Sequence, residues 1–299
     1  GLETARRAWR RAMESWVTAS TIALGPIGDD NRDLRIEFWP DANNNVPRAV
    51  AQQLLRDDSL TAETLAAQSV AAQGLPAFER LLFDPETDVL AAFTTDGRAA
   101  RRCSYAQAIA GNLVAIARAV EVGWTEAGGY ATQLASAGRG SDVFATREAA
   151  IDDVVNGLVT ALSILRDARI ADPLGGGTAA EAKPFRAESV LSGNSLANLA
   201  AAVRGAGASY DAGGAFGFDD YLRSSGRDAL AAQITAELRA LETRIAGIPV
   251  PLAEAVADDA YRPAVVELLD RATMVARLIE SDLSAAMDVT IGFNENDGD

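Results

Sequence analysis

Five stretches of this chain repeat their apolar residues at the spacing of an α-helix, and no other feature constrains the fold as much. Each stretch is at least two heptads long, a length typical of helices that pack into bundles. The chain is 48% hydrophobic but only 6% aromatic, and no window alternates as a strand would. The sequence therefore predicts an all-α protein whose long helices cover residues 2–16, 105–120, 151–165, 230–245 and 265–283.

Shorter periodic stretches and glycine-rich segments divide the rest of the chain. Shorter helices are expected over residues 46–56, 61–71, 76–83 and 195–205. Polar or glycine-rich segments, which in a compact bundle are functional or covering loops, occupy residues 25–45, 135–142, 172–186 and 209–218. We place a domain boundary near Gly138, which predicts two packed four-helix-type bundles, residues 1–138 and 139–299.

The acidic balance of the chain excludes one large class of partners. Lys and Arg number 27 against 42 Asp and Glu, for a formal net charge of -15. A field of that sign repels phosphate backbones, so we expect no nucleic acid partner. The acidity is typical of a soluble surface, and it also attracts cations.

The two residue types that carry most metal and nucleophilic chemistry are scarce. The chain has no histidine, and Cys103 is its single cysteine. Without an imidazole, a Ser-His-Asp arrangement is excluded and Cys103 has no base to activate it. Zinc sites depend on His nitrogen and Cys sulfur, so a zinc peptidase of the usual kind is not expected. A metal site would have to use oxygen ligands, which suit hard cations.

No apolar run is long enough to span a bilayer. The best window, residues 105–124, is interrupted by Arg118 and Glu121. The chain starts at Gly1 with neither an initiator Met nor a signal peptide, and we expect that any export segment was removed before this numbering begins.

Several short segments, spread over almost the whole chain, form an ordered set that is specific although each member is weak alone. The set consists of Phe38-Trp39-Pro40, Gly74-Leu75-Pro76-Ala77-Phe78-Glu79 with Leu81-Leu82-Phe83, Gly138-Arg139-Gly140, Glu188-Ser189 with Ser192-Gly193-Asn194-Ser195, Gly217-Phe218-Asp219-Asp220, Ile291-Gly292-Phe293-Asn294 and Asp297-Gly298-Asp299. Together they resemble the imelysin family, also described as insulin-cleaving membrane proteases.

This resemblance implies a fold, a location and a role. The fold would be two helical bundles related by approximate symmetry, with the family motif near their junction. The location would be the bacterial envelope, either periplasmic or held by a lipid anchor that the full-length precursor carries. Related proteins are linked to iron uptake, and the peptidase label of the family attaches to a Gly-x-His-x-x-Glu motif.

The motif carries over to this chain with one change. Gly74 matches its glycine and Glu79 its glutamate, but Pro76 stands where the histidine belongs. A His and a Glu three residues apart share one helical face and can ligate one ion, whereas proline offers no donor atom. Proline does suit the first turn of a helix, so we expect Pro76 to mark a helix start.

The family-like segments supply the candidate residues for a ligand or metal site. These candidates are Glu79, Arg139, Glu188, Ser189, Asp219 and Asp220. The hypothesis is that some of them face the bundle junction and bind a polar ligand or a hard cation, either iron or calcium.

Each candidate also has a purely structural alternative. Glu79 would pair with an arginine such as Arg139, as buried carboxylates usually do. Asp219 and Asp220 would cap a helix before Tyr221. Glu188 and Ser189 would cap a helix or anchor a loop.

Three functions remain open on the sequence alone. The first is a non-catalytic envelope protein that binds a small ligand, a cation or another envelope protein at the junction of the bundles. The second is a peptidase of the imelysin type that uses carboxylates. The third is a structural or interaction protein in which the motif region only packs.

Overall fold

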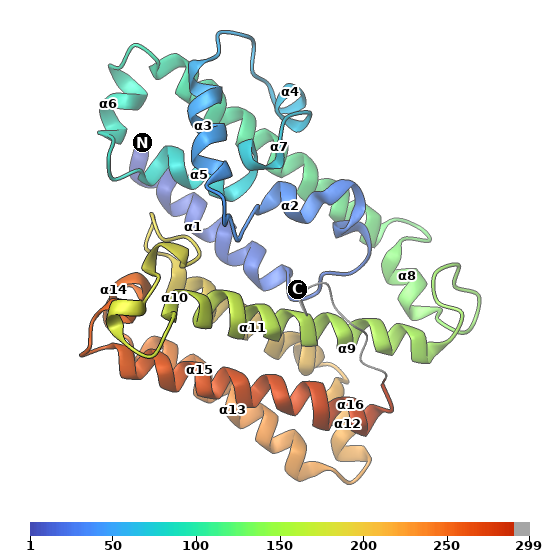
Figure 1. Cartoon of the computed structure of the whole chain (residues 1–299). Helices are drawn as coiled ribbons and strands as arrows, with labels where there is room; N and C mark the ends of the chain where they lie inside the picture. The colour runs from blue at the N-terminus through green and yellow to red at the C-terminus, as the bar shows by residue number, and fades with distance from the viewer. Residues whose placement is uncertain (290–299) are drawn as a thin grey trace. The chain divides into compact units, whose positions relative to one another are not determined.

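The computed structural model describes residues 1–289, and within them the chain forms helices joined by turns and loops without a strand (Figure 1). The prediction of an all-α fold is confirmed. No helix in this part of the chain is both long and apolar enough to cross a membrane. The family-like segments at 291–294 and 297–299 lie outside the described residues.

The chain groups into two compact units that are not contiguous in sequence. The first unit contains Gly1–Met13 and Gly25–Tyr130, and the second contains Glu14–Leu24 together with the chain from Ala131 onward. Helix α1 (Leu2–Ala19) therefore contributes residues to both units.

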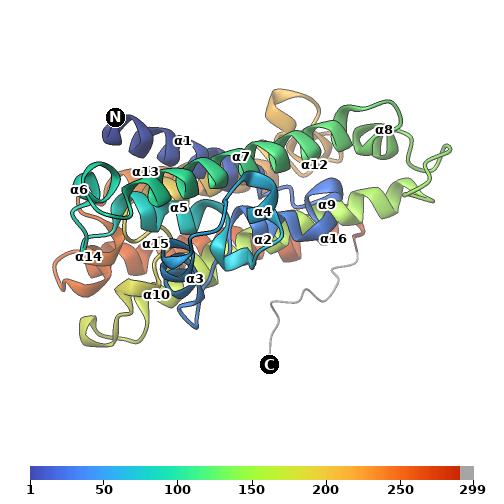
Figure 2. The same ribbon diagram turned by 90° about the horizontal axis from the view of Figure 1, so that it is seen from above.

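The first unit is built around one long helix, α7 (Ala99–Thr125), which appears uninterrupted in Figure 2. Its buried residues follow a helical stripe through Tyr105, Ile109, Asn112 and Ile116. The other elements of this unit are the first part of α1, η1 (Gly25–Ile27), η2 (Asp29–Asn31), α2 (Arg32–Ile36), α3 (Asn45–Leu55), α4 (Ala62–Ala66), η3 (Val70–Ala72), α5 (Gly74–Phe83) and α6 (Val89–Thr94).

The core of the first unit forms where α3, α4 and α5 pack against α7. Its buried members are Val46, Val50, Leu65, Ala71, Ala72, Ala77, Leu81, Tyr105, Ala108 and Ile109. Helix α1 adds Trp9, whose indole N–H donates to the Leu75 carbonyl at 2.9 Å and whose ring meets Phe83 edge-on with centroids 5.3 Å apart. These contacts hold helix α5 between α1 and α7.

The second unit is a bundle of four long helical rods. The rods are α9 (Arg147–Ser163) continued by η4 (Ile164–Ala171), α11 (Ser195–Tyr210), α13 (Asp228–Ala246), and α15 (Arg262–Arg277) continued by η8 (Leu278–Leu283). Shorter elements precede, connect or follow them: α8 (Tyr130–Ala135), α10 (Asp172–Leu174), η5 (Ala179–Glu181), η6 (Pro184–Arg186), η7 (Ala212–Gly214), α12 (Phe218–Ser224), α14 (Leu252–Ala257) and α16 (Ser284–Met287).

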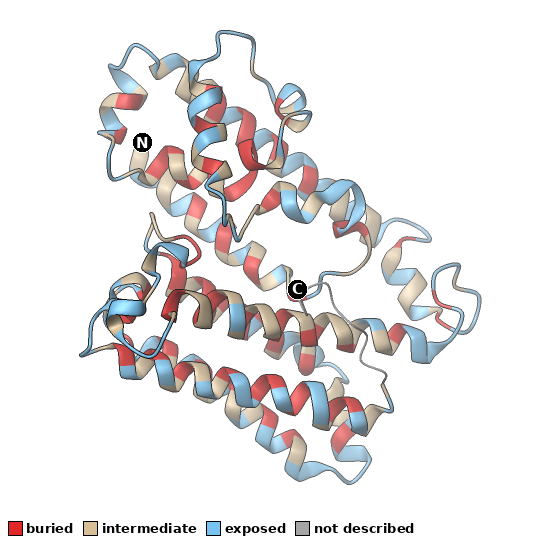
Figure 3. Cartoon of the chain, in the orientation of Figure 1, coloured by how far each residue is buried: buried red, intermediate tan, exposed pale blue. Residues whose placement is uncertain are grey.

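The apolar stripes of these rods form the core of the bundle. Along α13 and α15, buried residues recur on one side of each helix and exposed residues on the other (Figure 3). The stripes found in the sequence supply the fully buried residues Leu158, Leu162, Leu165, Ile234, Leu241, Val265, Leu268, Val275, Ile279 and Leu283. The helical period of 3.6 residues thus predicted which face of each rod is buried.

Two rods end in π-helical turns, η4 and η8, which the sequence did not indicate. The first rod was expected over residues 151–165, but the chain stays helical through Leu174. Pro173 lies near the end of this helical stretch, in the short α10 that directly follows η4.

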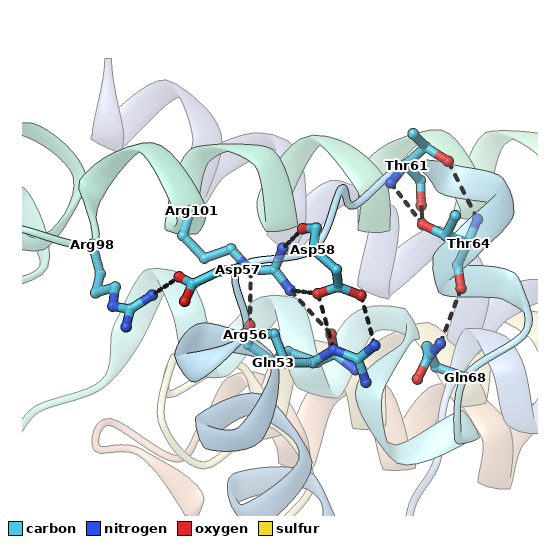
Figure 4. A network of polar contacts seen from close by, with 9 residues as sticks. All are labelled: Gln53, Arg56, Asp57, Asp58, Thr61, Thr64, Gln68, Arg98 and Arg101. Carbon is cyan, nitrogen blue, oxygen red and sulfur yellow. Dashed lines mark hydrogen bonds and ion pairs between the residues drawn. The ribbon is translucent and has the colours of Figure 1, made fainter.

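A polar network fastens the loop after α3 to the start of α7 (Figure 4). Arg101 of α7, whose side chain is 10% exposed, donates from Nε to the Gln53 carbonyl at 2.8 Å and from Nη2 to Asp58 Oδ1 at 3.3 Å. Arg56 donates two hydrogen bonds to the same carboxylate, from Nε to Oδ1 at 3.0 Å and from Nη2 to Oδ2 at 2.6 Å. The fork of hydrogen bonds from Arg56, with the charge of Arg101, lowers the pKa of Asp58 from its ordinary 3.8 to about 2.

We expect the carboxyl carbon of Asp58 to titrate near pH 2 in a carbon-13 NMR experiment, and near its ordinary pH in Arg56→Gln. Because the folded-state pKa is the lower one, the interaction stabilises the fold above about pH 4, and this contribution is lost as the pH falls toward 2. Arg48→Gln, an exposed change on α3 that does not touch Asp58, is the control. Ordinary titration of Asp58 in the unaltered protein would contradict the network.

Candidate functional site

The motif segment of the first unit keeps its backbone role at Gly74. This residue follows the N-cap Gln73 and opens α5 with a φ of 74°. A Cβ atom here would lie 2.4 Å from the carbonyl oxygen of Ile36 and 2.6 Å from that of Arg35. Only glycine permits both this φ and this approach to the end of α2.

The donor side of the same motif is lost at Pro76. Pro76 lies in the first turn of α5, as predicted, and contributes no polar side-chain atom. Glu79 follows one turn later, is 7% exposed and makes polar contacts of its own. The segment therefore contains the closely packed Gly74 and the buried carboxylate of Glu79, but no imidazole.

A buried polar node lies directly before the motif and was missed by sequence reasoning. Asn112 Nδ2 donates to Gln73 Oε1 at 2.8 Å, and Arg35 donates to Gln73 Oε1 at 3.3 Å and to Asn112 Oδ1 at 3.2 Å. Gln73 and Asn112 are 1% and 2% exposed. The available signal was Asn112 itself, a polar residue in register with the apolar stripe of α7.

Glu188 of the second unit is at the centre of a buried polar cluster. Arg169 Nε of the π-helical segment η4 donates to Glu188 Oε1 at 2.8 Å, and the two side chains are 8% and 3% exposed. Asn198 Nδ2 of α11 donates to Glu188 Oε2 at 2.7 Å and to Ser189 Oγ at 2.9 Å. The Ser195 hydroxyl donates to the Glu188 backbone carbonyl. Both carboxylate oxygens of Glu188 are therefore engaged within the protein.

The backbone around this cluster is a tight turn rather than a helix cap. Ser189 has a φ of 54° and Gly193 a φ of 68°, both in the left-handed region. Asn194 N–H donates to the Ser189 carbonyl at 3.2 Å, and Asn194 Nδ2 donates to Asn198 Oδ1 at 2.8 Å. The family-like residues thus anchor this loop to the start of α11.

Asp219 and Asp220 do not cap a helix, which corrects the capping alternative. Helix α12 starts at Phe218 after the N-cap Gly217, so both carboxylates lie in its first turn. Arg223 Nη1 donates to Asp219 Oδ2 at 2.6 Å and to Asp220 Oδ1 at 3.1 Å. Both carboxylates also face the positive end of the helix dipole.

Gly217 brings Asp219 to the edge of a cavity in the second unit. A Cβ on Gly217 would lie 2.7 Å from the Tyr210 carbonyl, so the chain passes close to the end of α11. The cavity measures about 440 Å³ and is lined by α11, α12 and α13. Burial, together with the charge of Asp219, raises the pKa of the Tyr210 phenol in its wall.

Arg139 lies apart from these polar clusters in the turn after α8. It is exposed, and its Nη2 donates to the Ala135 carbonyl at 3.3 Å.

The described residues do not fit a dedicated metal site. Within residues 1–289, no three His, Cys, Asp or Glu side chains converge on a position that could hold an ion. Arg169 already neutralises Glu188, and Arg223 lies between Asp219 and Asp220. A hard cation needs several oxygen ligands, and a guanidinium among them repels it.

We expect Gly74→Ala to lower the free energy of unfolding by about 1–3 kcal/mol from the strained φ alone, with the backbone overlap adding to this. Gly97→Ala is the matched control, because a Cβ there meets nothing within 4 Å. Urea unfolding followed by far-UV circular dichroism measures both. Equal effects of the two changes would contradict the structural role of Gly74.

We expect Glu188→Gln to destabilise the protein by about 3 kcal/mol, because it removes the carboxylate charge paired with the buried Arg169. The exposed Glu254→Gln should change stability by less than about 0.5 kcal/mol. The same unfolding experiment compares them. A Glu188→Gln protein as stable as the parent would show that the pair contributes nothing to the fold.

Comparison with known proteins agrees with the segments found in the sequence. Iron-regulated protein A of Synechococcus elongatus is 29% identical over 202 residues, which span 66% of this chain but only 49%, about half, of that relative. The crystal structure of an imelysin-like protein from Psychrobacter arcticum has a TM-score of 0.76 at 23% identity, covering 98% of this chain and 83% of that one. A protein from Parabacteroides distasonis described as an iron-regulated protein A precursor has a TM-score of 0.72 at 16% identity, covering 94% and 83%.

The family model described as Imelysin matches residues 1–279, nearly the whole chain. The two structural likenesses support the same fold. This chain therefore belongs to the imelysin family and is a homologue of iron-regulated protein A.

Proposed function

We propose that this protein is a non-catalytic binding protein of the bacterial envelope, with a role connected to iron. The proposal rests mainly on the motif segment, in which two positions match the family motif and the metal-binding position does not. Gly74 keeps its close approach to α2 and Glu79 stays buried, but Pro76 replaces the side chain that would ligate a catalytic metal. The backbone conformation at Gly74 and the buried carboxylate of Glu79 are present, but the imidazole that a catalytic metal would need is absent from this segment.

Two further observations support a binding role. The chain has no histidine, so no other segment can supply the missing imidazole. The second unit contains a cavity of about 440 Å³, a size typical of sites for small ligands, and one of the family-like segments forms part of its wall.

The connection with iron rests on relatives, and the envelope location rests on what the family resemblance implies. Two of these relatives carry the name iron-regulated protein A, which states that iron regulates those proteins. We extend this to the present chain as a protein whose production responds to iron. We do not extend it to a bound iron ion, because the candidate carboxylates Glu188, Asp219 and Asp220 are already paired with arginines.

We expect the purified protein, recovered from the envelope fraction of cells that produce its full-length precursor, to leave unfolded protein substrates intact with or without a chelator. The assay is mass spectrometry of the substrate after incubation with added zinc, iron or calcium. Glu79→Gln and the exposed control Glu86→Gln are tested beside it.

One result would overturn the non-catalytic reading. It is cleavage by the unaltered protein that a chelator stops and that Glu79→Gln, but not Glu86→Gln, removes. Recovery of the mature protein from the cytoplasmic fraction would contradict the envelope location.

A further inference from the structure

We infer that the cavity between α11, α12 and α13 binds a small zwitterion of the free α-amino acid type, with its carboxylate toward Arg204 and Arg239 and its ammonium group toward Asp219. The inference rests on the proposed function, because it treats the protein as one that returns its ligand unchanged. It adds a chemical class of ligand and the residues that recognise each end of it.

The cationic side of the cavity comes from two arginines without internal partners. Arg204 of α11 and Arg239 of α13 both line the cavity and are exposed. The side chain of neither arginine makes a hydrogen bond or an ion pair within the part of the chain that the structure describes. Two unpaired guanidinium groups on neighbouring helices form a site for a carboxylate, which they can bind through paired N–H donors.

The anionic side is Asp219, whose hydrogen bonding is incomplete. Its Oδ2 accepts from Arg223 at 2.6 Å, while its Oδ1 is shielded from water and has no partner among residues 1–289. A carboxylate oxygen left without a donor is a costly arrangement, which a ligand N–H can relieve. The whole side chain is 14% exposed, and the terminal torsion of an aspartate is soft, so a small rotation brings Oδ1 to the cavity wall.

The charge balance of the lining favours a ligand with both signs over a simple ion. Three cationic residues, Arg204, Arg223 and Arg239, face three anionic ones, Asp211, Asp219 and Glu242. A metal ion bound by Asp219 would be repelled by the Arg223 guanidinium, whose Nη1 lies 2.6 Å from Asp219 Oδ2. A simple anion would find the arginines but would leave Asp219 Oδ1 without a donor. A zwitterion satisfies both ends.

The remaining wall accommodates a side chain on such a ligand. Val203, Ala208 and Leu238 provide an apolar surface beside the charged groups. The volume of about 440 Å³ exceeds what the amino and carboxylate groups alone occupy. The cavity thus has a polar end that fixes orientation and an apolar wall that contacts the rest of the ligand.

The test is isothermal titration calorimetry of the full chain with L-leucine, L-glutamate and L-arginine. The tightest binder is then compared with its deaminated analogue, which lacks the ammonium group, and with its α-amide, which lacks the carboxylate. We expect each analogue to bind about tenfold more weakly or worse, the effect of losing one charge-assisted hydrogen-bonding group.

Two variants assign the ends of the ligand. Asp219→Asn should bring the amino acid down to the affinity of its deaminated analogue, and Arg239→Gln should bring it down to that of the amide. Arg227→Gln removes an exposed charge from the same unit outside the cavity and should change nothing. Should a variant misfold by circular dichroism, the comparison of analogues in the unaltered protein decides alone.

The inference is overturned if none of the three amino acids binds, if the analogues bind as well as the parent, or if Asp219→Asn keeps the preference for the ammonium group. Chelator-sensitive cleavage by the same preparation would instead overturn the proposed function. A protein that neither cleaves substrates nor binds these zwitterions loses only the present inference.

Discussion

The second unit depends on the close approach of α11 to the chain around it. Gly205 lies so near α1 that a Cβ would come within 2.6 Å of the Thr18 carbonyl. Arg204, the neighbour of Gly205 in the sequence, lines the cavity. Asn198, near the start of the same helix, donates to the Glu188 carboxylate. One helix therefore contributes to the core, to the hydrogen bonds around the buried ion pair and to the wall of the candidate ligand site.

In both units, buried side-chain amides bind an arginine: the half-buried Arg35 in the first and the buried Arg169–Glu188 pair in the second. In the first, the amides of Gln73 and Asn112 engage Arg35, and in the second, Asn198 completes the pair of Arg169 and Glu188. Each network lies in or directly beside a family-like segment, and its hydrogen bonds are made within the protein, so it fixes a loop rather than receives a ligand. The incomplete bonding at Asp219 sets the cavity apart from both.

The sequence predicted what local periodicity determines and missed what distant partners determine. The stripe ending at Ile245 predicted the buried face of α13, because a helix repeats its environment every 3.6 residues. Glu188 was recognised as a candidate, but its partner Arg169 was not, because pairing depends on a π-helical turn that no residue pattern announces. The capping expected of Asp219 was wrong because α12 already begins at Phe218, with Gly217 as its N-cap, so both carboxylates lie in its first turn and accept from Arg223.

The assignment of Glu14–Leu24 to the second unit has a consequence for how the chain is made. Thr18 Oγ1 donates to the Ala201 carbonyl, a partner 183 positions later, and its neighbour Val17 is fully buried in the finished molecule. At ribosomal speeds of about 5–20 residues per second, this apolar segment waits on the order of ten seconds or more before its covering helix exists. The segment Glu14–Leu24 is thus synthesised first in the second unit but can be buried only after α11 has been made. A fragment that ends at Tyr130 would keep this segment but lose α11, whose Ala201 carbonyl accepts from Thr18.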